Sequence, residues 1–71
     1  MLTIIFLDDK RRLTIPRMHY LLLTDEWYRN KMIQLESQKN VLFIYELTPH
    51  TSDLLPVKES YERLLDLLNE H

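Results

Sequence analysis

Four basic side chains are the groups in this chain best suited to binding a charged ligand. They lie within eight residues of one another, with no acidic residue among them, at Lys10, Arg11, Arg12 and Arg17. The formal net charge of the whole chain is −2, so the rest of the sequence is acidic and the charge is unevenly distributed. A block of one sign is typical of a surface that binds a polyanion, although a solvated loop is the other interpretation.

Residue types that are missing exclude several classes of enzyme. The chain has no glycine and no cysteine. Phosphate-binding loops and the nucleophile turn of α/β-hydrolases need glycine, because the backbone there has a positive φ or approaches its ligand closely. Without cysteine there is no disulfide, thiolate nucleophile or zinc ribbon. We therefore expect a cytoplasmic protein that is not an enzyme, uses no metal or other cofactor and does not associate with a membrane.

The other titratable and nucleophilic side chains give little support for a catalytic or metal site. No histidine has a second histidine one helical turn away, and no serine follows a rigid turn of the kind that presents a nucleophile. Asp8 and Asp9 could bind a hard cation, but the basic residues that follow favour a loop held by its own ion pairs. We interpret the remaining candidates as surface, loop or cap residues: His19, His50, His71, Ser37, Ser52 and Ser60.

The first part of the chain predicts two short strands and a brief helix. Residues 2–7 and 13–15 are apolar runs rich in β-branched side chains, which is typical of strands. Pro16 holds the residue before it in an extended conformation and suits the first position of a helix over residues 17–23. Trp27 follows as a bulky anchor, which we expect to pack against the sheet.

The middle of the chain predicts a β-hairpin. Residues 31–35 and 41–47 are rich in apolar side chains, and the polar residues 37–40 between them suit a hairpin loop. In this arrangement Lys31 lies opposite Glu46 as a surface ion pair. A polar linker over residues 49–56 then leads to an amphipathic helix over residues 57–71. Its apolar residues recur at helical spacing, at Val57, Tyr61, Leu64, Leu65 and Leu68.

The segment LDDKRRLTIPR, Leu7 to Arg17, resembles the signature of the AbrB/MazE/MraZ family of prokaryotic swapped-hairpin proteins. Asp8 matches the acidic position of that signature and Arg12 the basic position. Ile15-Pro16 matches the Ile-Pro step that leads into a brief helix. With the predicted helix and hairpin, the resemblance extends over about residues 3–47.

This resemblance implies a homodimer whose hairpins interleave into one small β-barrel and whose basic loop lies along double-stranded DNA. A shared core also suits the length, because a chain of 71 residues buries only about 60% of its unfolded surface on its own. The implied fold is mainly β with short helices: a swapped-hairpin domain over residues 1–48, the linker and the C-terminal helix. The implied function is a small DNA-binding transcriptional regulator, dimeric or of higher order, with Lys10, Arg11, Arg12, Arg17 and His19 at the DNA.

Two departures from the family pattern leave an alternative function. Arg11 stands where the family has a loop glycine, and residues 18–21 lack the arginines that relatives often carry there. A protein that kept the fold but lost DNA binding would be an interaction module, such as an antitoxin that binds a toxin or an adaptor that binds a regulator. The partner would contact the C-terminal helix through Tyr61, Leu64, Leu65 and Leu68, unless that helix packs on its own domain instead.

Overall fold

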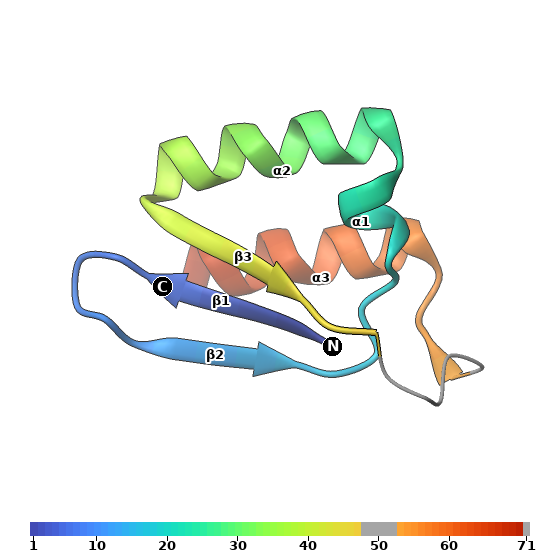
Figure 1. Cartoon of the computed structure of the whole chain (residues 1–71), viewed down its shortest axis with the longest axis horizontal. Coiled ribbons are helices and arrows are strands. Elements are labelled where there is room, and N and C mark those ends of the chain that lie inside the picture. The colour runs from blue at the N-terminus through green and yellow to red at the C-terminus, as the bar shows by residue number, and fades with distance from the viewer. Residues whose placement is uncertain (48–52, 71) are drawn as a thin grey trace.

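Three antiparallel strands and three helices make up the described chain, which comprises residues 1–47 and 53–70 of a computed structural model (Figure 1). About half of the chain is helical and the three strands form an open sheet, so a mainly β chain with short helices was the wrong expectation. The strands are β1 (Leu2–Phe6), β2 (Arg12–Ile15) and β3 (Val41–Tyr45). The helices are α1 (Leu21–Thr24), α2 (Glu26–Lys39) and α3 (Val57–Glu70).

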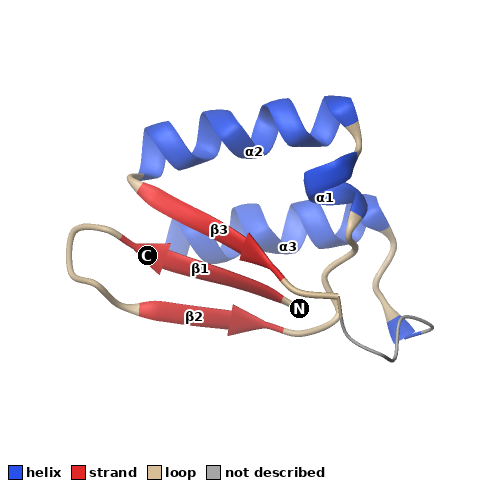
Figure 2. Cartoon of the chain, in the orientation of Figure 1, coloured by secondary structure: helices blue, strands red, loops and turns tan. Residues whose placement is uncertain are grey.

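The sheet has β1 in the centre, with β2 and β3 at its edges. Ile4 of β1 lies opposite Leu13 of β2 and Phe43 of β3. Because side chains alternate between the two faces of a strand, these three residues share one face with the other even-numbered residues of β1. Helix α3 passes behind this sheet in the view of Figure 1, and no helix is drawn across the near face in Figure 2.

One hydrophobic core lies between the sheet and the helices. The even-numbered residues of β1 are buried in it, and so is one apolar stripe of each long helix. The helices cover most of this face of the sheet, although Leu13 of β2 is 37% exposed there, and no described helix covers the opposite face. The buried members are Leu2, Ile4, Phe6, Ile15, Met18, Leu22, Met32, Leu35, Val41, Phe43, Leu64 and Leu68.

The predicted hairpin is wrong in its first half, because residues 31–35 belong to α2. Asp25 begins this helix: its carboxylate accepts a hydrogen bond from the Tyr28 N–H at 3.2 Å, which satisfies a free amide of the first turn. Asn40 ends it in the left-handed region, with φ 52°. The predicted cross-strand ion pair of Lys31 does not form, and its ammonium lies 5.4 Å from the centre of a tryptophan ring within α2.

The helix predicted over residues 17–23 is also wrong in its extent. Only Leu21–Thr24 is helical, and Pro16 lies in a turn rather than at a helix start. Arg17 has φ 67°, which no right-handed helix can contain. A residue just before α3 stabilises this turn, since the Leu55 N–H donates to the Arg17 carbonyl at 2.8 Å.

Trp27 does not pack against the sheet as expected. It lies on α2 with 57% of its surface exposed, and its ring meets Tyr61 of α3 edge-on, with 6.1 Å between ring centres. Tyr28, its neighbour in the chain, contacts both rings and packs on the core. The tryptophan therefore helps to join the two long helices at their surface.

Three predicted strands and the C-terminal helix are confirmed, and their observed ends differ from the predicted ones by no more than two residues. The strands were predicted over residues 2–7, 13–15 and 41–47. Most of the linker predicted over residues 49–56 lies outside the described residues, as do His50, Ser52 and His71. Ser60 is not a surface residue: it is fully buried. Its hydroxyl accepts from the His19 N–H at 3.1 Å and donates to the Leu55 carbonyl at 3.3 Å.

Candidate functional site: the basic loop and the open face of the sheet

The loop between β1 and β2 and the first residue of β2 together carry three of the four basic residues, and acidic neighbours contact part of this cluster. The Arg11 guanidinium lies 3.4 Å from the Asp9 carboxylate and 5.9 Å from the centre of the Phe6 ring. Asp8 accepts a hydrogen bond from the Asn40 side chain. The acidic pair thus holds the loop, as its sequence suggested, and offsets part of its positive charge.

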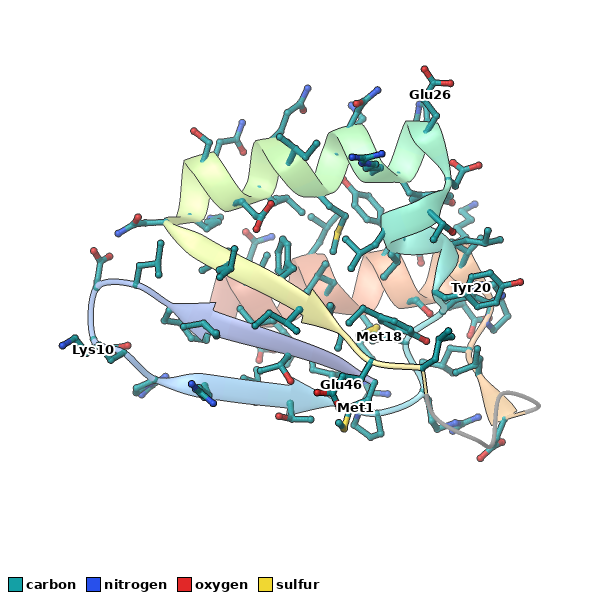
Figure 3. All side chains as sticks on the ribbon, in the orientation of Figure 1. Met1, Lys10, Met18, Tyr20, Glu26 and Glu46 are labelled. Carbon is teal, nitrogen blue, oxygen red and sulfur yellow. The ribbon has the colours of Figure 1, made fainter. Side chains whose placement is uncertain are left out.

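Lys10 and Arg12 are the exposed cations of this loop that make no ion pair with any described residue. Lys10 occupies the tip, as its label in Figure 3 shows, with φ 60°. Arg12 begins β2 and lies opposite Ile5 of β1. These two side chains are therefore the part of the basic cluster available to a ligand.

Arg17 and His19 lie apart from the loop. Arg17 follows the far end of β2, about 16 Å along the chain from Arg12 at roughly 3.3 Å per residue. Its guanidinium donates to the Asp53 carbonyl at 2.8 Å and lies 3.5 Å from the Asp53 carboxylate. The His19 ring accepts from the Leu21 N–H at 3.1 Å through Nδ1. The five residues predicted at a DNA surface therefore do not form one patch in a single protomer.

The predicted partner-binding residues of α3 face the interior of the protein. Leu64 is fully buried, and Leu68 is buried with it. Tyr61 and Leu65 are partly buried and pack against the same core. This helix thus packs on its own domain. That was the alternative to partner binding given for it in the sequence analysis.

No described helix lies across the face of the sheet opposite the core, and we call it the open face. Side chains project from the open face at every second residue of each strand, alternating with the residues that face the core. On this face, the hydroxyls of Thr3 and Thr14 form a hydrogen bond (3.4 Å) that joins β1 to β2. Its large apolar members Leu7, Leu42 and Ile44 are 51%, 44% and 42% exposed. The open face consists of Thr3 and Ile5 of β1 with Leu7 just after it, Arg12 and Thr14 of β2, and Leu42 and Ile44 of β3 with Glu46 just after it.

Glu46 extends the open face by one row beyond β3. Its N–H donates to the Met1 carbonyl at 3.0 Å, and the Met1 amino group donates to the Glu46 carbonyl at 3.0 Å. Burial lowers the pKa of that amino group, and the negative charge of Glu46 opposes the decrease. Figure 3 shows Glu46 beside Met1 at the end of the sheet opposite Lys10. The open face therefore has a cation near one end and an anion at the other.

Two hollows in the described surface offer little chemistry. One, of about 380 Å³, is mostly apolar and lined by Tyr20, Leu23, Thr24, Tyr45 and Leu47. The other, of about 300 Å³, lies beside the loop and includes Asp8, Asp9 and Lys39. Within residues 1–47 and 53–70 there is no cluster of three or more residues that could hold a metal ion, and no helix there is long and apolar enough to cross a membrane.

The open face was not singled out from the sequence, although β3 carried a signal for it. All five residues of VLFIY are apolar, a pattern typical of strands that are covered on both sides. Helices cover only one side here. Comparison with known proteins adds no further guide, since no family model, curated protein or solved structure matches the chain.

Proposed function

We propose that this protein is a non-enzymatic protein-interaction module whose open face binds another folded polypeptide. The observation that carries this proposal is the exposure of Leu42 and Ile44 on the edge strand β3, on the face of the sheet that no described helix covers. Apolar side chains grouped on one surface favour a protein partner, because their removal from water stabilises the complex.

The chemistry of the open face specifies the kind of partner. Leu42 and Ile44 need a flat apolar surface, while Arg12 and Glu46 need an acidic and a basic group in matching positions. Complementary charges of this type set the orientation of a complex more than its affinity. The partner we propose is therefore a folded surface with an apolar patch and one charge of each sign.

Site-specific photo-cross-linking in the cells that make the protein tests this function. A photoreactive residue at Thr14, on the open face, is expected to form a cross-link to a polypeptide, and the same residue at Gln34, exposed on α2, is not. Ile44→Lys should abolish the Thr14 cross-link. Ile33→Lys is the matched control, because Ile33 is a comparably exposed isoleucine (52%) on α2. Equal cross-linking from both positions, or none from either, would contradict the proposal.

A second candidate function is DNA binding by a dimeric regulator of AbrB type. The specific observation in its favour is that Lys10 and Arg12 are exposed beside Arg11 and make no ion pair with described residues. Removing two cations that each bind a DNA phosphate should reduce the magnitude of the slope of log K against log salt by about 1.8, or about 0.9 for each contact. A titration of duplex DNA at several salt concentrations therefore tests it, with Lys10→Ala/Arg12→Ala compared with Lys58→Ala on α3.

The same titration separates the two candidates. DNA binding predicts an affinity that is measurable at low salt and falls in the Lys10→Ala/Arg12→Ala variant but not in Ile44→Lys. An interaction module predicts no measurable affinity for DNA. It predicts instead that Ile44→Lys abolishes the protein complex, as measured by the Thr14 cross-link.

A further inference from the structure

We propose that the partner of the open face is a second copy of this chain, packed face to face with its strands crossing at about 70°. This inference rests on the proposed function, since it names the occupant of the same surface. It is carried by the positions of the two charges on that face, which make the surface complementary to itself.

Arg12 and Glu46 occupy diagonally opposite corners of the open face. Arg12 lies on β2 opposite Ile5, whereas Glu46 follows β3 and pairs with Met1. The two are therefore separated by two strand spacings, about 10 Å, and by four residues along the strand, about 13 Å. Thr3, on the central strand, lies at the midpoint between them.

A two-fold axis in the plane between two such faces, perpendicular to the diagonal, places Arg12 of each copy over Glu46 of the other. The interface then contains two equivalent ion pairs, as an isologous dimer requires. Leu42 and Ile44 lie on the β3 side of the line that joins these pairs, where they face the same two residues of the other copy. The same operation turns one set of strands by about 70° relative to the other, which is close to the orthogonal class of sheet packing. Thr3 lies on the axis and faces its own counterpart.

The outer edge of β3 is a less suitable surface for a second copy. The Glu36 carboxylate, reaching from α2, accepts a hydrogen bond from the Phe43 N–H at 3.1 Å. Phe43 is the middle residue of β3, so one of the edge amides that a neighbouring strand would need is already occupied. A copy that docks through β3 is therefore directed to the open face rather than to this edge.

The size of the face predicts a weak dimer. Three strands by five residues cover about 250 Å² in plan, well below the roughly 800 Å² per partner of a standard interface. We therefore expect a dissociation constant of about 10 μM or weaker.

Light scattering and sedimentation of the full chain over a wide range of protein concentration test for the dimer. The wild type should change from monomer to dimer as concentration rises, and Ile44→Lys or Leu42→Gln should weaken the dimer at least tenfold. Ile33→Lys should leave the dimer unchanged. A wild type that stays monomeric at about 1 mM would overturn the inference. If the chain is monomeric but the photoreactive residue at Thr14 forms a cross-link to a different protein, the proposed function is still supported.

Charge reversal tests the orientation. Arg12→Glu and Glu46→Arg should each weaken the dimer severalfold, and the double variant should recover most of the lost affinity, whereas Arg29→Glu on α2 should have no effect. Because the chain has no cysteine, Thr3→Cys provides a single thiol on the proposed axis. A short bismaleimide should join two Thr3→Cys chains rapidly and two Ser37→Cys chains far more slowly. A double variant no better than the single ones, or equal cross-linking at both sites, would overturn this packing.

Discussion

The buried hydroxyl group of Ser60 joins the segment around His19, which is distant in the sequence, to the residues just before α3. It accepts from the His19 N–H and donates to the Leu55 carbonyl. In Ser60→Ala both partners lose that bond inside the protein, so we expect the free energy of unfolding to fall by about 1–3 kcal/mol. Urea denaturation measures the change. Ser37→Ala, at an exposed position of α2, is the control and should change stability by no more than about 0.5 kcal/mol.

Tyr45 should make stability depend on alkaline pH. Its hydroxyl donates to the Met18 carbonyl at 2.9 Å. Burial raises the pKa of Tyr45 above its ordinary value, and the neighbouring Tyr20 adds to the increase. A raised pKa means that the folded state holds the proton more tightly than the unfolded state. This contribution is therefore complete below the unfolded pKa of about 10 and is lost as pH rises through the folded pKa.

Tyr45→Phe tests that dependence directly. At neutral pH we expect it to lower the free energy of unfolding by about 1 kcal/mol, because the bond to Met18 is absent. Between about pH 9 and 11 its stability should fall less steeply than that of the wild type. Urea denaturation across this range is the measurement, with Tyr61→Phe as the control. Parallel curves for Tyr45→Phe and the wild type would contradict the assignment.

Helix α2 shows why an element can be missed in the sequence. Met32, Ile33 and Leu35 form a short apolar run that fits a strand or a helix equally well. The helical signals lie at its two ends, where Asp25 caps the first turn and Asn40 adopts the left-handed conformation. Tyr28, Met32 and Leu35 then recur at spacings of four and three along the side that faces the core. Ile33 obscured this pattern because it is exposed.

The strands were predictable for the opposite reason. Residues 2–7 are nearly all apolar or β-branched and end at an acidic pair, so no competing helical pattern exists there. What could not be predicted is which face of β3 would remain open. Val41 and Leu42 are equally apolar, and only the placement of α3 across one side of the sheet distinguishes them. The candidate site could therefore not be predicted from the sequence, although the strand that carries it could.

The turn between β1 and β2 places a positive φ on a residue that has a Cβ atom. In the family resemblance the glycine position is Arg11, but the positive φ falls one residue earlier, on Lys10 (φ 60°). A left-handed residue other than glycine costs about 1 kcal/mol, so Lys10→Gly should raise the free energy of unfolding by about 0.5 kcal/mol after the greater freedom of glycine in the unfolded chain is deducted.

Thermal and urea denaturation of Lys10→Gly measure this gain. Lys31→Gly is the control, because it introduces the same residue into the interior of α2, where it should cost about 1 kcal/mol. Destabilisation by both variants would show that the turn does not need the left-handed conformation at Lys10. DNA affinity measured in the same variant reports separately on the lysine charge.

At the scale of the whole molecule, α3 decides whether residues 1–47 can fold alone. Leu64 is fully buried against a core that includes Leu2 and Ile4 of β1. A chain of this size has a total stability of only about 4–10 kcal/mol, and Leu64→Ala alone should remove about 2–5 kcal/mol of it. Removal of residues 57–71 exposes the part of the core that α3 covers, so we expect the truncated chain to lose cooperative unfolding.

Calorimetry and amide NMR of the truncated chain test this expectation, and Leu64→Ala and Leu65→Ala make the matched pair. Leu65 is only partly buried, so its substitution should cost clearly less than that of Leu64. If α3 were instead a ligand for a separate partner, the truncated chain would keep a sharp unfolding transition and both leucine variants would be nearly neutral. Loss of folding on truncation, with Leu64→Ala the more harmful substitution, makes the helix part of the scaffold that holds the sheet with one face open.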